Sequence, residues 1–166
     1  MQAHAGEFVL SSPDVADGVT IAEEQVYAGF GCHGGNLSPA LFWSQVPEGT
    51  RSFAVTVHDS DSPRPGGWWH WLLFNIPVDT EGLPKGAGTL GHEPAGSTQS
   101  LTSFGTAGYG GPCPPAGHGV HHYVFTVYAL DTEELGYAAG ASPEQVAAAI
   151  RRHAIASASL TVLYQR

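Results

Sequence analysis

Residues 52–76 read SFAVTVHDSDSPRPGGWWHWLLFNI, and this stretch decides much of the fold. Residues 52–58 alternate in polarity and contain β-branched side chains, which is typical of a strand. Residues 68–76 are almost continuously apolar, which predicts a second strand lying within the core. Residues 59–67 consist mainly of Asp, Ser, Pro and Gly, which favour turns, so we expect a loop between the two strands.

Other segments carry similar strand signals. Residues 121–130 (HHYVFTVYAL) predict a third strong strand, residues 41–44 (LFWS) a compact one, and residues 158–164 (ASLTVLY) a final one. Residues 23–27 predict a further short strand. These segments together indicate a mainly β fold.

One helix is expected near the C-terminus. Ser142 is a good N-cap, Pro143 suits the first turn, and Gln145 completes a capping-box pattern. Apolar residues then recur at spacings of three and four, which is typical of one buried helix face. The helix should end near Ala154.

The rest of the chain is expected to be loop. Residues 29–35 are rich in glycine, and residues 78–113 are mostly irregular in pattern. A long irregular segment within a compact domain is often functional. The 166 residues have the length of one domain, so we predict a single domain over 1–166.

Composition excludes several classes of function. The formal charge is −9, and the six basic residues are scattered, so neither nucleic acid nor an anionic membrane surface is an expected partner. No apolar run is long enough for a membrane-spanning helix. Residues Met1 to Gly6 lack the basic and apolar regions of a signal peptide, so we expect a cytoplasmic protein.

The two cysteines allow two interpretations. Cys32 and Cys113 are too far apart in sequence for a redox motif, and no further cysteines suggest zinc. The simplest interpretation is two separate thiols. A single disulfide is the alternative, and it requires Cα atoms within about 7 Å.

Titratable residues cluster where the predicted strands meet loops. Asp59 and Asp61 follow one strand, His70 lies within the next, and His121 and Tyr123 share a face of a third. Each has a structural interpretation, as turn former, core histidine or solvated edge residue. Metal-binding, Gly-x-Ser-x-Gly and P-loop motifs are absent, so we predict no metal and no cofactor.

Four segments, taken in order, resemble one family. They are residues 36–39 (NLSP) with Trp43, residues 57–71, residues 108–130 and residues 159–164. They resemble the phosphatidylethanolamine-binding protein family, in its bacterial, Raf-kinase-inhibitor-like branch. The resemblance implies a large antiparallel sheet packed against a smaller one, with peripheral helices. It also implies a surface pocket for anions, such as a phospholipid head group or phosphotyrosine.

The family's pocket maps onto nine residues of this chain. They are Asp59, Asp61, Pro63, His70, Gly111, Pro114, Pro115, His121 and Tyr123. We expect imidazole N–H groups and the backbone of the Gly-rich turn to donate to the anion. Trp68, Trp69 and Tyr123 should supply apolar walls. Such a site would need neither lysine nor arginine.

The chain departs from the family motif at three places. The loop reads Asp-Ser-Asp-Ser-Pro instead of Asp-Pro-Asp-Ala-Pro, His122 replaces an arginine, and His58 adds a titratable group near the pocket. We therefore carry three hypotheses. The first is a small-molecule binding protein for anionic ligands, with a homodimer left open. The second is a cofactor-free dehydratase or cyclase with His70, Asp59 and His121 as acid and base. The third is a protease or kinase inhibitor acting through residues 78–107.

Overall fold

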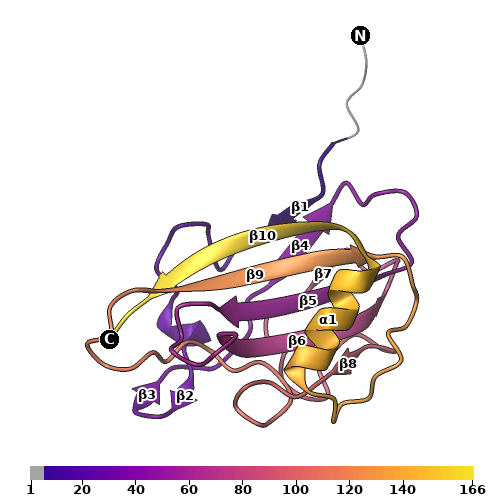
Figure 1. The fold of residues 1–166 in the computed structure, drawn as a ribbon. Coiled ribbons are helices and arrows are strands. Elements are labelled where there is room, and N and C mark those ends of the chain that lie inside the picture. Colours follow the sequence, from indigo (N-terminus) through magenta and orange to yellow (C-terminus); the bar gives the residue numbers. More distant parts are fainter. Residues whose placement is uncertain (1–5) are drawn as a thin grey trace.

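The computed structural model describes residues 6–166 (Figure 1). The strands are β1 (Val9–Ser11), β2 (Ala28–Gly29), β3 (Cys32–His33), β4 (Leu41–Ser44), β5 (Ser52–Asp59), β6 (Trp68–Pro77), β7 (Gly82–Leu83), β8 (Thr98–Gln99), β9 (His121–Leu130) and β10 (Ala154–Tyr164). The helices are the short 3₁₀ helix Glu23–Gln25 and α1 (Pro143–His153). Apart from Gly6, the stretch behind the signal-peptide prediction lies outside the described residues. Within residues 6–166, no helix is long and apolar enough to cross a membrane.

The strands form one large and two small antiparallel sheets. The large sheet has five strands in the order β10-β9-β5-β6-β8. A three-stranded sheet has the order β1-β4-β7, and β2 and β3 form a separate hairpin. The predicted mainly β fold, with a large sheet packed against a smaller one, is confirmed.

Both faces of the large sheet are buried, which explains the continuous apolar pattern of its central strands. On one face, Phe53 and Trp71 share a core with Trp43 of the three-stranded sheet. On the other face, Leu72 packs with Val146 of α1, and Figure 1 shows this helix lying across the sheet. Burial of apolar surface on two sides stabilises the sheet that carries the site.

The helix begins and ends as its capping pattern predicts. The Ser142 side chain accepts a hydrogen bond from the backbone of Gln145, and the Gln145 side chain accepts one from the backbone of Ser142. Pro143 occupies the first turn, where its missing N–H leaves no bond unmade. The helix ends at His153, and β10 begins with the next residue.

Three local predictions are wrong. The segment 23–27 contains a 3₁₀ turn instead of a strand, because Val26 N–H bonds back to the carbonyl of Glu23. The glycine-rich loop 29–35 contains part of the β2–β3 hairpin, whose turn places Phe30 at φ 53°. Cys32 and Cys113 form a disulfide with a Cα–Cα distance of 6.1 Å, so the separate-thiol interpretation does not hold.

Candidate functional site

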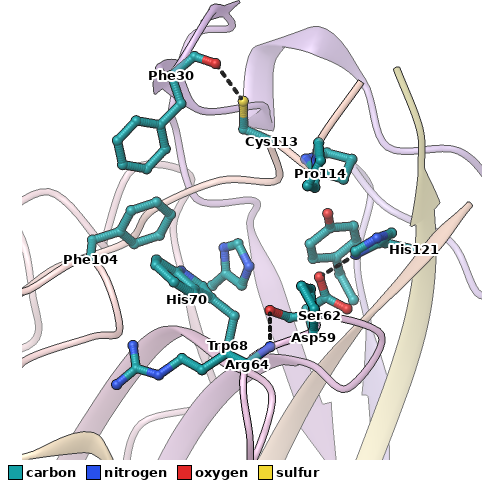
Figure 2. A pocket seen from close by; sticks show the side chains of 13 residues that line it. Phe30, Asp59, Ser62, Arg64, Trp68, His70, Phe104, Cys113, Pro114 and His121 are labelled. Carbon is teal, nitrogen blue, oxygen red and sulfur yellow. Dashed lines mark hydrogen bonds and ion pairs between the residues drawn. The ribbon is translucent and has the colours of Figure 1, made fainter. Parts of the chain in front are cut away.

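A cavity of about 270 Å³ opens where β5 ends and where β6 and β9 begin (Figure 2). Its lining contains seven of the nine predicted residues, namely Asp59, Pro63, His70, Pro114, Pro115, His121 and Tyr123. Asp61 and Gly111 do not line it. Trp68, predicted as an apolar wall, also lines it. The unpredicted lining residues are Phe30, Ser62, Arg64, Phe104 and Cys113.

A β-bulge turns His70 toward the cavity. Val57 pairs with Trp71 and His58 pairs with Trp69, so His70 is the extra residue on β6. A bulge breaks the alternation of side chains along a strand and re-aims one of them. His70 therefore reaches the cavity although Trp71, its neighbour, packs into the core on the same side. Regular alternation would have placed His70 and Trp71 on opposite faces.

The same bulge decides which of the two neighbouring tryptophans faces the cavity. Trp68 lines the cavity, whereas Trp69 packs with the cluster on the α1 side of the sheet. The prediction that Trp69 forms a pocket wall is therefore wrong. On that opposite face, the Trp69 ring lies 4.1 Å from the ring of His58. His58 also donates from Nε2 to the carbonyl of Gly66 at 2.7 Å, so it does not add a titratable group to the cavity.

His70 is held as a neutral imidazole with a defined tautomer. Its Nδ1 lies 2.7 Å from the carbonyl oxygen of Gly110, which can only accept, so Nδ1 carries the proton. The Gly110 N–H returns a bond to the His70 carbonyl at 2.9 Å. Burial lowers the pKa of His70 to about 4. Near neutral pH, Nε2 is thus a hydrogen-bond acceptor, and the prediction that His70 donates to an anion is wrong.

This buried histidine should make stability depend on pH. In the unfolded chain His70 takes up a proton near pH 6.5, but in the folded protein it does so only near pH 4. The unfolded state therefore binds more protons in this window, and the free energy of unfolding should fall by roughly 3 kcal/mol as pH decreases through it. Urea unfolding of the wild type and His70→Asn across this range measures the effect. A stability difference between the two proteins that does not change with pH would contradict it.

A chain of hydrogen bonds runs from the core to the surface beside His70. The buried Asp59 Oδ2 lies 2.6 Å from His121 Nδ1, and His121 Nε2 lies 2.6 Å from Nδ1 of the exposed His118. Asp59 Oδ1 accepts a second bond, from the backbone N–H of Asp61 at 2.9 Å. Asp59 thus orients His121 and fixes the loop after β5. Both ring nitrogens of His121 are occupied within the protein.

Asp61 faces outward and belongs to a separate pair. Its Oδ2 accepts bonds from the backbone N–H of His122 at 2.7 Å and from His122 Nδ1 at 2.8 Å. The side-chain bond from His122 lowers the pKa of Asp61. His122 lies on the opposite side of β9 from the buried His121 and Tyr123, as the alternation predicts. Asp61 therefore ties the loop to β9 from outside the cavity.

Gly111 supports the cavity wall without facing the cavity. Its N–H donates to Asn36 Oδ1 at 2.8 Å, and a Cβ at this position would lie 2.0 Å from the Gln25 carbonyl oxygen. The Asn36 side chain also donates to the carbonyl of Tyr109 at 3.3 Å. The backbone N–H groups of Gly110 and Gly111 are therefore both used within the protein. This differs from the prediction that they donate to a ligand.

Arg64 is the lining residue that matters most among those not predicted. Its guanidinium lies 5.4 Å from the ring centre of Trp68 and donates one weak bond, at 3.4 Å, to the carbonyl of Ser103. The expectation of a site free of lysine and arginine is therefore wrong. The sequence did contain a signal, because Arg64 lies directly beside Pro63 of the predicted loop.

Two phenylalanines form the apolar rim and come from remote loops. Phe104 lies at the end of the long irregular segment, and its ring packs edge-on against His70 at 5.3 Å and Trp68 at 5.2 Å. Phe30, at the tip of the β2–β3 hairpin, stacks on Phe104 at 5.9 Å. Figure 2 shows both rings on one side of the opening, across from Pro114 and His121. No sequence pattern links these positions to the pocket.

Comparison with known proteins places this geometry in a family. The family model described as phosphatidylethanolamine-binding protein matches residues 11–165. The chain belongs to this family. The phosphatidylethanolamine-binding fold also accounts for the large and small sheets and the terminal helix.

Individual relatives agree with the assignment to the phosphatidylethanolamine-binding protein family. YbcL of Escherichia coli strain K12 is 44% identical over 165 residues, covering 98% of this chain and 90% of YbcL. YbhB of the same strain is 45% identical over 156 residues, covering 93% of this chain and 98% of YbhB. The crystal structure of YbcL matches with a TM-score of 0.94, covering 97% of this chain and 99% of that chain. CT736 of Chlamydia trachomatis matches with a TM-score of 0.79 at 32% identity, covering 96% of this chain and 98% of that chain.

Proposed function

We propose that the cavity binds a small anionic molecule and that Arg64 supplies the positive charge of the cavity. Arg64 is the one lysine or arginine among the thirteen lining residues, in a chain of net charge −9. Its guanidinium keeps most of its N–H groups free, since Ser103 takes only one weak bond. Such a group binds carboxylate or phosphate in a paired, charge-assisted geometry. This free cation at the cavity is the observation that carries the proposal.

The cavity walls support a ligand that also has an apolar part. Phe30, Trp68 and Phe104 line one side, and Pro114 and Pro115 line another. Small-molecule sites commonly combine apolar walls with a few polar groups that fix orientation. The family resemblance supports phosphorylated molecules, such as phospholipid head groups, as the class to test first. A homodimer stays a prediction.

Removal of the Arg64 charge should weaken anion binding about ten-fold, because a charge-assisted hydrogen bond contributes about 1.5 kcal/mol or more. Calorimetric titration of Arg64→Gln with phosphoethanolamine and with inorganic phosphate measures this change. Arg51→Gln is the matched control. Arg51 lies beside the other end of β5, where it is exposed and pairs with Glu133 at 3.8 Å.

Two outcomes would contradict the proposal. The first is equal anion affinity in the wild type and Arg64→Gln. The second is an equal loss in Arg64→Gln and Arg51→Gln, which would reveal a general effect of net charge in place of a site.

One observation favours acid–base chemistry as a second candidate function. The bonds from Asp59 through His121 to His118 connect a buried carboxylate with solvent. Such a chain can move a proton between the cavity and the surface. NMR spectra of a cell extract before and after incubation separate the candidates. A compound that disappears with the wild type but persists with His121→Ala would favour the enzyme.

The third hypothesis is an inhibitor that acts through residues 78–107. The apolar side chains that could anchor a partner there are Leu83, Leu90, Leu101 and Phe104. Leu83 is buried in β7, and Phe104 lines the cavity. Leu90 is 60% exposed, whereas Leu101 is partly buried. Of the four side chains, Leu90 alone is largely exposed, which gives the inhibitor hypothesis little support.

A further inference from the structure

The two cavity histidines offer a ligand no hydrogen-bond donor. His70 donates a hydrogen bond from Nδ1 to the Gly110 carbonyl, so its neutral ring presents a lone pair at Nε2. In His121, Nδ1 bonds Asp59 and Nε2 bonds Nδ1 of His118. One proton lies between these two histidines, and Nε2 of His121 is occupied whichever ring carries it. A fully deprotonated oxygen placed against His70 would face a lone pair of like partial charge. An oxygen that keeps its proton would donate a hydrogen bond there.

His70 is held in this state by geometry on several sides. The reciprocal bonds with Gly110, at 2.7 and 2.9 Å, fix the ring plane. The rings of Phe104 and Tyr123 pack edge-on against it at 5.3 and 5.1 Å. His70 is 4% exposed, so the ring has little room to turn over. Burial also lowers its pKa, which keeps Nε2 unprotonated near neutral pH.

We infer that the cavity selects anions that retain a proton, such as a monoprotonated phosphate or an acid bearing a hydroxyl group, through a hydrogen bond to His70 Nε2. The protonated oxygen then satisfies the His70 lone pair, which an anion without a proton leaves unmatched. This selectivity rests on the proposed function, because it specifies the ligand of the same cavity. It makes His70 a specificity-determining residue.

Phosphate and sulfate test the inference directly, because they share size and tetrahedral shape. At about pH 6 phosphate keeps a proton, whereas sulfate has none. Calorimetric titration of the wild type should show phosphate binding at least about ten-fold more tightly than sulfate, as expected when a polar group is left unpaired. In His70→Asn the amide N–H can still bond Gly110, but the Nε2 lone pair is gone. The preference should therefore shrink to near unity in His70→Asn and persist in His122→Asn, whose histidine bonds Asp61 outside the cavity.

The outcomes separate this inference from the proposed function. Equal binding of phosphate and sulfate by the wild type overturns the selectivity but leaves an anion site. Binding of neither anion overturns both. A preference that survives in folded His70→Asn overturns the role of His70.

A second measurement on the wild type decides the matter if His70→Asn does not fold. The affinity for methyl phosphate should fall relative to that for methyl sulfate as pH rises from about 5 to about 8, since a phosphate monoester loses its last proton near pH 6. The other charged and titratable groups near His70 are His58, Asp59, Arg64, Tyr109, His121 and Tyr123. Methyl sulfate keeps one negative charge throughout, so its own pH dependence reports how the titration of these groups changes anion binding. A ratio of the two affinities that stays constant would overturn the inference.

Discussion

Reduction of the Cys32–Cys113 disulfide is expected to lower the free energy of unfolding by about 4 kcal/mol. The bond joins residues separated by 81 positions, so it removes many conformations from the unfolded chain. It also ties the β2–β3 hairpin, and with it Phe30, to the segment that carries Pro114. Urea unfolding with and without a phosphine reductant measures the loss. Anion titration under the same two conditions shows whether the cavity wall depends on the bond.

The double variant Cys32→Ala/Cys113→Ala provides the control. It should match the reduced wild type in stability and should not respond to the reductant. Thiol titration under denaturing conditions checks the premise, because the oxidised protein should contain no free thiol. Two free thiols in protein purified without reductant would contradict the prediction.

The disulfide also bears on location. The cytoplasmic prediction rested on the absence of membrane and export signals from the sequence. Disulfides persist mainly in oxidising compartments and are rare in the reducing cytoplasm. The cytoplasmic location therefore stays a prediction, and the Cys32–Cys113 bond is the observation that weighs against it.

Local patterns predicted the strands and the helix because the forces that form them act over a few residues. Alternation identified β5 and β9, and the Ser142 capping box located the start of α1. The disulfide was beyond such patterns, since it depends on a distance between segments far apart in sequence. Phe30 and Phe104 reach the cavity for the same reason, through the packing of two loops.

The cavity residues themselves were found by resemblance, but their chemistry was not. His70 was expected to donate to an anion, and only its contact with the Gly110 carbonyl reveals that it accepts. The bulge between Val57 and His58 decides which of Trp68 and Trp69 faces the cavity, and a bulge leaves no clear trace in sequence. Residue identity thus predicted most of the cavity lining, while hydrogen-bond partners decide which donors and acceptors the cavity presents.

Asp59→Ala is expected to destabilise the protein by about 3 kcal/mol or more, whereas Asp61→Ala should cost less than about 1 kcal/mol. Both carboxylates bond a histidine of β9, at 2.6 Å for Asp59 and 2.8 Å for Asp61. They differ in burial. The side chains of Asp59 and His121 are 5% and 2% exposed, against 40% and 53% for Asp61 and His122. Urea unfolding of the two variants measures what an aspartate–histidine pair contributes to stability when it is buried and when it is exposed.

The difference follows from what each removal leaves behind. Without Asp59, the buried His121 Nδ1 and the backbone N–H of Asp61 lose their acceptor. Without Asp61, water replaces the carboxylate at His122. A double-mutant cycle with His121→Ala tests this cause, because Asp59→Ala should cost much less once His121 is gone. Equal costs for Asp59→Ala in both backgrounds would show that the carboxylate acts through the loop alone, and the bond to His121 would then contribute little to stability.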